Sequence, residues 1–413
     1  MSAFSSVKAR RKPSLAFVLW CAFLAVLWLA GGASRADVTG QVVSRLAAAI
    51  VLVLIAAFGN KPIVRPVAPV CWLLLAAVLL TVVQLIPLPP SIWQALPGRA
   101  LFDGAVATPH QPWRPLSIAP SATINALVSL LVPIAALTLI LTMRFEERGA
   151  IFLTLLLMIG ASVLLGLLQI TGIGFDNPLI NDSRDLVSSS FANRNHFALL
   201  LAIGCLLLPV WGFAGQRPSR ERAGVALGAC LMVLLTILAT GSRAGMVLGV
   251  LGLGIGLVLA RSGIRRQLRH APKWVALAVP ALAAAIIIGT VVASIVAGRA
   301  VSIRRFLDTD TGFDMRGRAL PTVLAMIRDY FPVGAGLGSF DPVFRIYEPF
   351  ALLKPTYFNH VHNDFLEVVL DAGLPGALLL CVGLAWWIGA SVRAWKQPAG
   401  TTETSASGRP CCC

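Results

Sequence analysis

Long, continuous runs of hydrophobic residues fill most of the chain, and short polar segments separate them. Most runs reach the roughly 17–25 residues that an α-helix needs to cross the hydrocarbon core of a bilayer. Because a helix satisfies its own backbone hydrogen bonds, we predict an all-α integral membrane protein with about ten transmembrane helices. The predicted spans are Leu15–Gly31, Val42–Phe58, Val67–Ile86, Ala122–Met143, Ala150–Ile170, Phe197–Phe213, Gly224–Thr240, Gly245–Ala260, Trp274–Ala297 and Val368–Val392.

Composition excludes a soluble globular protein. Hydrophobic residues make up 57% of the 413 positions and charged residues only 13%. In soluble domains, roughly a quarter of all residues are charged, so this chain has too few charged residues to cover a water-facing surface.

The net charge of +16 reflects membrane topology and not nucleic-acid binding. Arginine and lysine gather in every second short loop, for example Arg217, Arg220 and Arg222 after the sixth span. Cytoplasmic loops carry such an excess, so the amino terminus is predicted to be cytoplasmic. The first run and Ala33-Ser34-Arg35-Ala36 also resemble a signal peptide, whose removal leaves the remaining topology unchanged.

This topology divides the chain into four predicted regions. Residues 1–297 form nine spans with short loops, and residues 298–367 form a large periplasmic loop that carries short helices. Residues 368–396 form the last span, and residues 397–413 a disordered cytoplasmic tail. Within the large loop, Leu320, Val323, Leu324, Ile327 and Phe331 recur at helical spacing.

Two arginines stand at external span ends, where the charge rule disfavours them. Arg194, in Asn193-Arg194-Asn195-His196, begins the sixth span, and Arg243 occupies a four-residue turn between two spans. A helix amino terminus is already partly positive, so an arginine there favours a bound anion. The alternative is that each side chain only reaches toward the membrane interface.

A further group of arginines begins the large loop, where nearby aspartates offer local salt bridges as the alternative to a ligand. The arginines are Arg304, Arg305, Arg316 and Arg318, and the aspartates are Asp308, Asp310 and Asp314.

Two histidines precede the last span in His360-Val361-His362-Asn363-Asp364, with Glu367 close behind. Histidine exchanges a proton near neutral pH, which makes this segment a candidate for acid–base chemistry. Histidines two residues apart do not share a helix face, so we predict no metal site. Arginine forks suit phosphate or pyrophosphate, and the chain has no P-loop. The external arginines together with these histidines fit the transfer of a group from a phosphorylated lipid to a hydroxyl without ATP.

These residues lie in segments that resemble the O-antigen ligase and polysaccharide polymerase superfamily. The similar segments are Ser190–Ala198, Gly241–Gly245, Pro332–Phe340, His362–Glu367 and Asp371–Gly376, with Pro87–Pro90 and Pro115–Ser117 in the first external loop. The resemblance implies a GT-C-like, inverting, metal-independent glycosyltransferase of the bacterial inner membrane that needs no cofactor. Its donor is a glycan on undecaprenyl pyrophosphate, transferred at the periplasmic face.

The resemblance also implies residue roles. Arg243 binds the pyrophosphate, with Arg194 and Arg316 as further anion contacts. His362 activates the acceptor hydroxyl or stabilises the leaving group, and His360, Asn363 and Glu367 support it.

The acceptor stays open, because ligases acting on lipid A core, polymerases acting on a growing glycan and protein O-oligosaccharyltransferases share these motifs. A membrane transporter is the alternative from a different class. It would place ionisable groups near the middle of its spans and use paired discontinuous helices. The span interiors here are almost free of charge.

Overall fold

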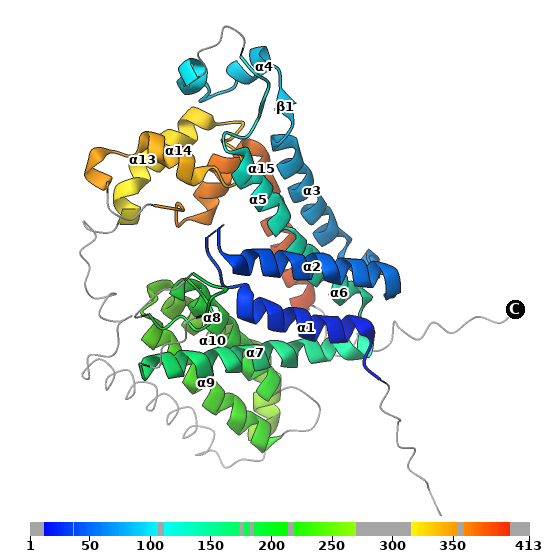
Figure 1. The fold of residues 1–413 in the computed structure, drawn as a ribbon. Helices are drawn as coiled ribbons and strands as arrows, with labels where there is room; N and C mark the ends of the chain where they lie inside the picture. Colours follow the sequence, from blue (N-terminus) through cyan, green and yellow to red (C-terminus); the bar gives the residue numbers. More distant parts are fainter. Residues whose placement is uncertain are drawn as a thin grey trace, which may run out of the picture. The chain divides into compact units, whose positions relative to one another are not determined.

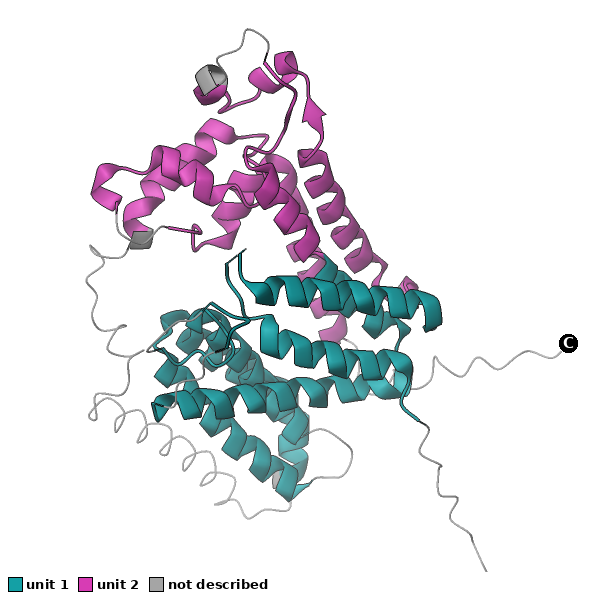
Figure 2. Cartoon of the chain, in the orientation of Figure 1, with its two compact units in different colours: residues 1–62, 131–310 teal, residues 63–130, 311–413 magenta. Residues whose placement is uncertain are grey.

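The computed structural model describes residues 12–35, 37–105, 111–172, 177–181, 186–213, 219–269, 315–353 and 358–396, without the side chains at positions 66, 103–105, 268, 315 and 316. Helices dominate these residues (Figure 1). The chain forms two compact units (Figure 2). Unit 1 comprises Met1–Pro62 and Leu131–Asp310, and unit 2 comprises Ile63–Leu130 and Thr311–Cys413.

Unit 1 is a helical bundle with two hydrophobic cores. Its helices are α1 (Leu15–Ala30), α2 (Thr39–Phe58), α6 (Leu131–Thr142), α7 (Arg148–Ile170), α8 (Arg194–Gly212), α9 (Arg220–Thr240) and α10 (Arg243–Leu268), with a 3-10 turn η3 at Phe145–Glu147. Helices α1, α2 and α6 share one core, which includes Phe23 and Leu139. Helices α7, α8 and α9 share the other, which includes Phe197 and Ile237.

Unit 2 combines apolar helices with short amphipathic ones. Its helices are α3 (Ala68–Gln84), α4 (Pro90–Gln94), α5 (Pro120–Ser129), α13 (Met315–Tyr330), α14 (Phe340–Tyr347) and α15 (Asp364–Lys396), with 3-10 turns η1 (Arg65–Val67), η2 (Ala100–Ala105) and η5 (Phe350–Leu352). Strands β1 (Pro87–Leu88) and β2 (Arg114–Pro115) pair antiparallel, with Pro87 opposite Pro115. The core is built mainly by α13 and α14 and includes Met326 and Phe340.

The predicted spans coincide with apolar helices wherever the structure describes them. Among the described residues, seven helical segments are long and apolar enough to cross a membrane, and α1 and α3 are shorter apolar helices. The span predicted at Trp274–Ala297 lies outside the described residues, so the total of about ten stays a prediction. Large apolar side chains such as Val53, Leu164 and Val250 are exposed along these helices. The chain is a multi-pass membrane protein.

The helix predicted in the large loop is confirmed as α13, but its buried face differs from the predicted one. Val323 is buried as expected, whereas Leu320 and Leu324 are 41% and 49% exposed. Ala319, Met326 and Tyr330 complete the buried side instead. The sequence offered two overlapping apolar stripes, and packing against α14 and α15 selected the one that includes the small Ala319 and the aromatic Tyr330.

Helices α8 and α10 run parallel and pack closely along a row of glycines. A Cβ atom added at Gly252 would lie 2.6 Å from the Ala202 carbonyl oxygen, and one at Gly256 would lie 2.5 Å from that of Leu206. A Cβ at Gly245 would overlap the side chain of Ala198. Small residues four apart allow helix backbones in membranes to approach in this way. Helix α9 connects them in sequence, and Gly241, at φ +69°, makes the tight turn from α9 into α10.

A break divides α15 and receives the glycine-rich segment after α13. Gly373 has φ +58° and ψ −147°, which interrupts the helix. The freed backbone groups bond to the 332–336 segment: Leu374 N–H donates to the Pro332 carbonyl (2.8 Å), and Ala335 N–H donates to the Leu370 carbonyl (2.9 Å). The glycines at 334, 336 and 338 therefore allow close packing and positive φ in this segment.

Glycine substitutions in α10 test this packing. We expect Gly252→Ala and Gly256→Ala to lower the free energy of unfolding by about 1–3 kcal/mol, because a methyl group must push two backbones apart. Gly254→Ala is the matched control, since a Cβ at Gly254 meets nothing within 4 Å. Thermal unfolding of the purified protein in nanodiscs measures the difference. Equal stability of the three variants would contradict close packing of α8 on α10.

Candidate functional site

The amino termini of α8 and α10 are joined by a hydrogen bond between the cap of α10 and the second residue of α8. Asn193 caps α8, and its side-chain oxygen accepts from the Asn195 N–H (2.8 Å). Ser242 caps α10, and its hydroxyl accepts from the Gly245 N–H (3.0 Å). The same hydroxyl donates to the side-chain oxygen of Asn195 (2.9 Å). The two helix ends therefore form one connected surface.

Arg194 and Arg243 occupy the first positions of these two helices. Arg243 is exposed and Arg194 partly exposed, and His196 is exposed in the first turn of α8. Because α8 and α10 run parallel, their partly positive ends are adjacent, and each carries an additional guanidinium group. A helix amino terminus with additional positive charge favours the binding of an anion. The structure thus brings together two of the predicted anion contacts within unit 1.

The segment before α8 is fixed in place by Gln169 of α7. The Gln169 side-chain oxygen accepts from the N–H groups of Ser188 (3.0 Å) and Ser189 (2.7 Å), and its amide donates to the Ser189 carbonyl (3.0 Å). Ala192 N–H donates to the Gly32 carbonyl (2.9 Å). The similar segment Ser190–Ala198 is therefore a rigid approach to the helix end, which preorganises Arg194.

In unit 2, the histidine segment folds back onto the first turns of α15. His360 Nδ1 lies 2.7 Å from a Glu367 oxygen, and the Val361 N–H donates to the other oxygen (3.1 Å). The hydrogen bond to Glu367 raises the pKa of His360 against the opposing effect of burial, and the carboxylates of Asp364 and Asp341 raise it further. Glu367 therefore holds His360 and fixes the shape of the loop.

His362 projects from this loop in an unusual backbone conformation. Its φ is +59°, which non-glycine residues adopt seldom and mostly at turns or functional sites. The residue is exposed, and its ring contacts the Phe358 ring edge-on, with centroids 5.2 Å apart. Asn363 begins the helix, because its side-chain oxygen accepts from the Leu366 N–H (3.3 Å) and its carbonyl from the Glu367 N–H (3.0 Å). The predicted supporting residues His360, Asn363 and Glu367 therefore each make a defined hydrogen bond.

The arginine group of the large loop is only partly described. Arg318 donates to the Ala351 carbonyl (2.7 Å), which links α13 to η5. Arg316 lies in the first turn of α13, but its side chain is outside the described atoms, as are Arg304 and Arg305. Within the described part of the chain, no group of three or more histidine, cysteine or acidic residues is arranged to hold a metal.

Sequence reasoning missed a buried polar centre around Asp371. This residue is 3% exposed, and one carboxylate oxygen accepts from the Gly338 N–H (2.7 Å). Its carbonyl accepts from the Gly336 N–H (2.8 Å) and from the Gln84 amide (3.0 Å). Gln84 also accepts from the Leu337 N–H (2.9 Å). An ionisable residue inside a predicted span was the available signal.

Arg99 forms a second buried centre in unit 2. Its side chain is fully buried and donates to the carbonyls of Pro97 (2.8 Å), Leu116 (2.6 Å) and Gly334 (3.1 Å). Burial lowers the pKa of Arg99 to about 10, so the guanidinium stays charged near neutral pH. It also lies over the Tyr330 ring, 5.4 Å from its centroid. Arg99 thus ties the first external loop to the glycine-rich segment.

Comparison with protein families gives one match. Residues 227–381 match the O-antigen ligase family model. This region runs from α9 into α15 and includes Arg243, Arg316, His362 and Asp371, whereas Arg194 precedes it. Comparisons with curated proteins and with solved structures give no match. The family match confirms, over residues 227–381, the resemblance to the O-antigen ligase superfamily that the sequence motifs indicated.

Proposed function

We propose that this membrane protein transfers a glycan from an undecaprenyl-pyrophosphate carrier to an acceptor hydroxyl at the periplasmic face of the inner membrane. The O-antigen ligase domain supports a glycan-transferring enzyme of polysaccharide biosynthesis. Among the acceptors, lipid A core is the one that this family description favours, in a ligase reaction of lipopolysaccharide biosynthesis.

One observation carries the proposal: two arginines stand at the joined amino termini of α8 and α10. Each helix end carries about half a positive charge, and each arginine adds a full one. Their mutual repulsion is offset when a dianionic group binds between them. Pyrophosphate matches this site, since guanidinium forks bind its oxygens in pairs. Arg243 and Arg194 are the principal contacts, and Arg316 is a further one.

His362 acts as the acid–base residue in this proposal. The acceptor hydroxyl attacks the anomeric carbon while the bond to the pyrophosphate oxygen breaks, and His362 takes the hydroxyl proton. A single displacement inverts the anomeric configuration. The lipid pyrophosphate leaves with its charge balanced by arginine, so the reaction needs neither a metal ion nor a cofactor. An exposed histidine held at the start of α15 fits this role.

The periplasmic placement of the site makes a topology prediction. A reporter that is active only in the cytoplasm should work when fused after Arg222 or Arg269, because those loops carry the basic excess. It should be inactive after Asp185 or Gly338. Reporter activity in whole cells, normalised to fusion-protein level, is the measurement. Activity at Gly338 would place the loop on the cytoplasmic side and exclude the proposed reaction.

Arg243→Lys tests the geometry of anion binding. Lysine keeps the charge but loses the two-pronged donor arrangement, so we expect at least a tenfold loss of transfer at unchanged membrane insertion. Arg261→Lys, at the other end of the same helix, is the matched control and should transfer normally. Transfer is measured with purified protein and a lipid-pyrophosphate-linked glycan. Near-normal transfer by Arg243→Lys would show that this side chain serves only the membrane interface.

His362→Ala and His362→Asn test proton transfer. A general base contributes about 10²–10⁴ in rate, so either variant should lose transfer by that factor while donor accumulates. Asparagine tolerates positive φ and therefore controls for loop folding. His360→Ala should have a milder effect, and EDTA should have none. Retained activity in both His362 variants, or inhibition by EDTA, would refute a metal-free role for His362.

A further inference from the structure

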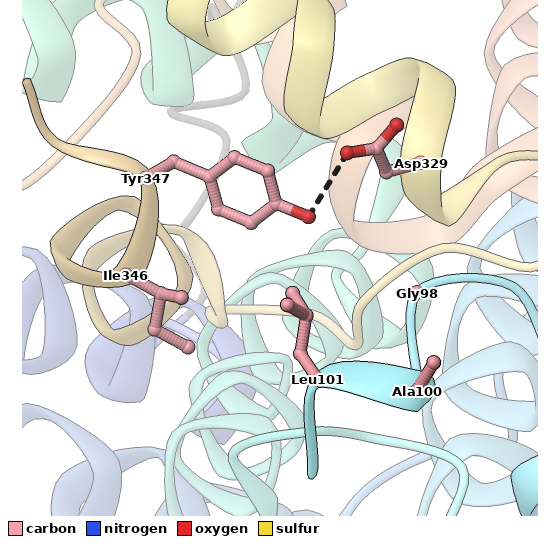
Figure 3. Close-up of a pocket in the computed structure, with 6 residues that line it drawn as sticks. All are labelled: Gly98, Ala100, Leu101, Asp329, Ile346 and Tyr347. Carbon is pink, nitrogen blue, oxygen red and sulfur yellow. Dashed lines mark hydrogen bonds between the residues drawn. The ribbon is translucent and has the colours of Figure 1, made fainter.

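A pocket of about 390 Å³ lies within unit 2, and no residue of the histidine segment lines it. Its volume is in the range of about 300–1,000 Å³ that is typical of small-molecule sites. Figure 3 shows the six residues that line it, which come from the first external loop, α13 and α14. They are Gly98, Ala100, Leu101, Asp329, Ile346 and Tyr347.

The loop wall of the pocket is held rigidly. Gly98 and Ala100 flank Arg99, whose buried side chain is anchored by three hydrogen bonds to the carbonyl oxygens of Pro97, Leu116 and Gly334. Gly98 has φ +75°, and a Cβ there would lie 2.7 Å from the Tyr330 ring, so no other residue fits without strain. The pocket is therefore formed before any ligand arrives, which lowers the entropic cost of binding.

One edge of the pocket is polar and the rest is apolar. The Tyr347 hydroxyl donates to a carboxylate oxygen of Asp329 (3.1 Å, Figure 3), and Arg328 donates to the other oxygen (3.3 Å). Burial raises the pKa of Tyr347, which keeps the hydroxyl protonated as a donor. A carboxylate accepts about four hydrogen bonds, so Asp329 retains capacity for a ligand. Leu101 and Ile346, both half exposed, supply the apolar surface.

We propose that this pocket binds one pyranose ring of the glycan substrate. A pyranose carries hydroxyl donors around its edge and C–H groups on its faces. The edge suits the Asp329 carboxylate, and the faces suit Leu101, Ile346 and the Tyr347 ring. This inference rests on the proposed function for the identity of the substrate, because a glycan-transferring enzyme must hold sugar units beyond the reacting one. The ring belongs to either the donor or the acceptor glycan.

Helix α14 connects the pocket to the proposed acid–base residue. Its last residues, Ile346 and Tyr347, line the pocket, whereas Phe340 and Phe344 pack on Phe358 at centroid distances of 5.8 and 5.3 Å. Phe358 in turn contacts the His362 ring. A saccharide bound in the pocket therefore rests on the same short helix that supports the His362 loop.

Saccharide binding by the purified full-length protein in nanodiscs tests the proposal. The probes are methyl pyranosides of glucose, galactose, mannose, rhamnose and N-acetylglucosamine, and binding is followed by saturation-transfer NMR. We expect at least one glycoside to bind, and Asp329→Asn to weaken it about tenfold or more, because it removes a charged acceptor. Ala100→Trp, which fills the pocket, should abolish binding. Ile92→Trp, an exposed position in the same loop region but outside the pocket, is the matched control.

The outcomes separate this inference from the proposed function. His362→Ala should lose transfer but keep saccharide binding. Binding by the wild type without transfer would refute the proposed function alone, and transfer without saccharide binding would refute the pocket. In the transfer assay, Asp329→Asn should raise KM for the acceptor if the ring is an acceptor sugar, or for the donor if it is a donor sugar. Unchanged values of both would overturn the assignment of the pocket to the glycan substrate.

Discussion

The close approach of α8 and α10 determines the electrostatics of unit 1. Glycines at 252 and 256 remove the side chains that would separate the two backbones. Because both helices run in the same direction, close packing also brings their partly positive ends together, and their dipoles repel. The Ser242–Asn195 hydrogen bond holds the ends in register despite this repulsion. Packing inside the span thus brings two partly positive helix ends together at its edge, and Arg194 and Arg243 add positive charge to the field that the backbone sets up.

Unit 2 uses close backbone approach for a different purpose. The break at Gly373 frees helix carbonyls and N–H groups, and the 332–338 segment pairs with them nearly as a strand pairs with its neighbour. Asp371 and Gln84 satisfy the amides that remain, at Gly338 and Leu337. Non-helical backbone within a membrane-spanning helix is stable only where other protein groups satisfy its hydrogen bonds. The two segments that resemble the superfamily, 332–340 and 371–376, therefore form one hydrogen-bonded contact. This contact anchors the loop region to the last span.

The sequence predicted the elements of this protein better than their contacts. Hydrophobic run length located the helices, because a bilayer imposes nearly the same requirement on each of them. The turn at Gly241 and the helix α13 also followed from local patterns. The buried face of α13 did not, since Leu320 and Ala319 compete for it and contacts with α14 and α15 decide between them. Arg194 and Arg243 stood out as charges in the wrong loops. Arg99, by contrast, did not stand out in the sequence. Its burial depends on the carbonyl groups of Leu116 and Gly334, which are distant from it in sequence.

The two histidines of the 360–364 segment have the same side chain, and only their contacts in the structure distinguish their roles. Both are imidazoles, and two positions separate them. His360 is paired through Nδ1 with Glu367, and its raised pKa keeps it protonated to higher pH, where a protonated imidazole cannot accept a proton. Its charge contributes to folding of the loop, and this contribution is lost as the pH rises through the raised pKa. His362 has the exposed position and the positive φ instead. The Glu367 carboxylate, one helical turn into α15, thereby gives His360 a structural role in the loop, whereas the proposed reaction assigns proton transfer to His362.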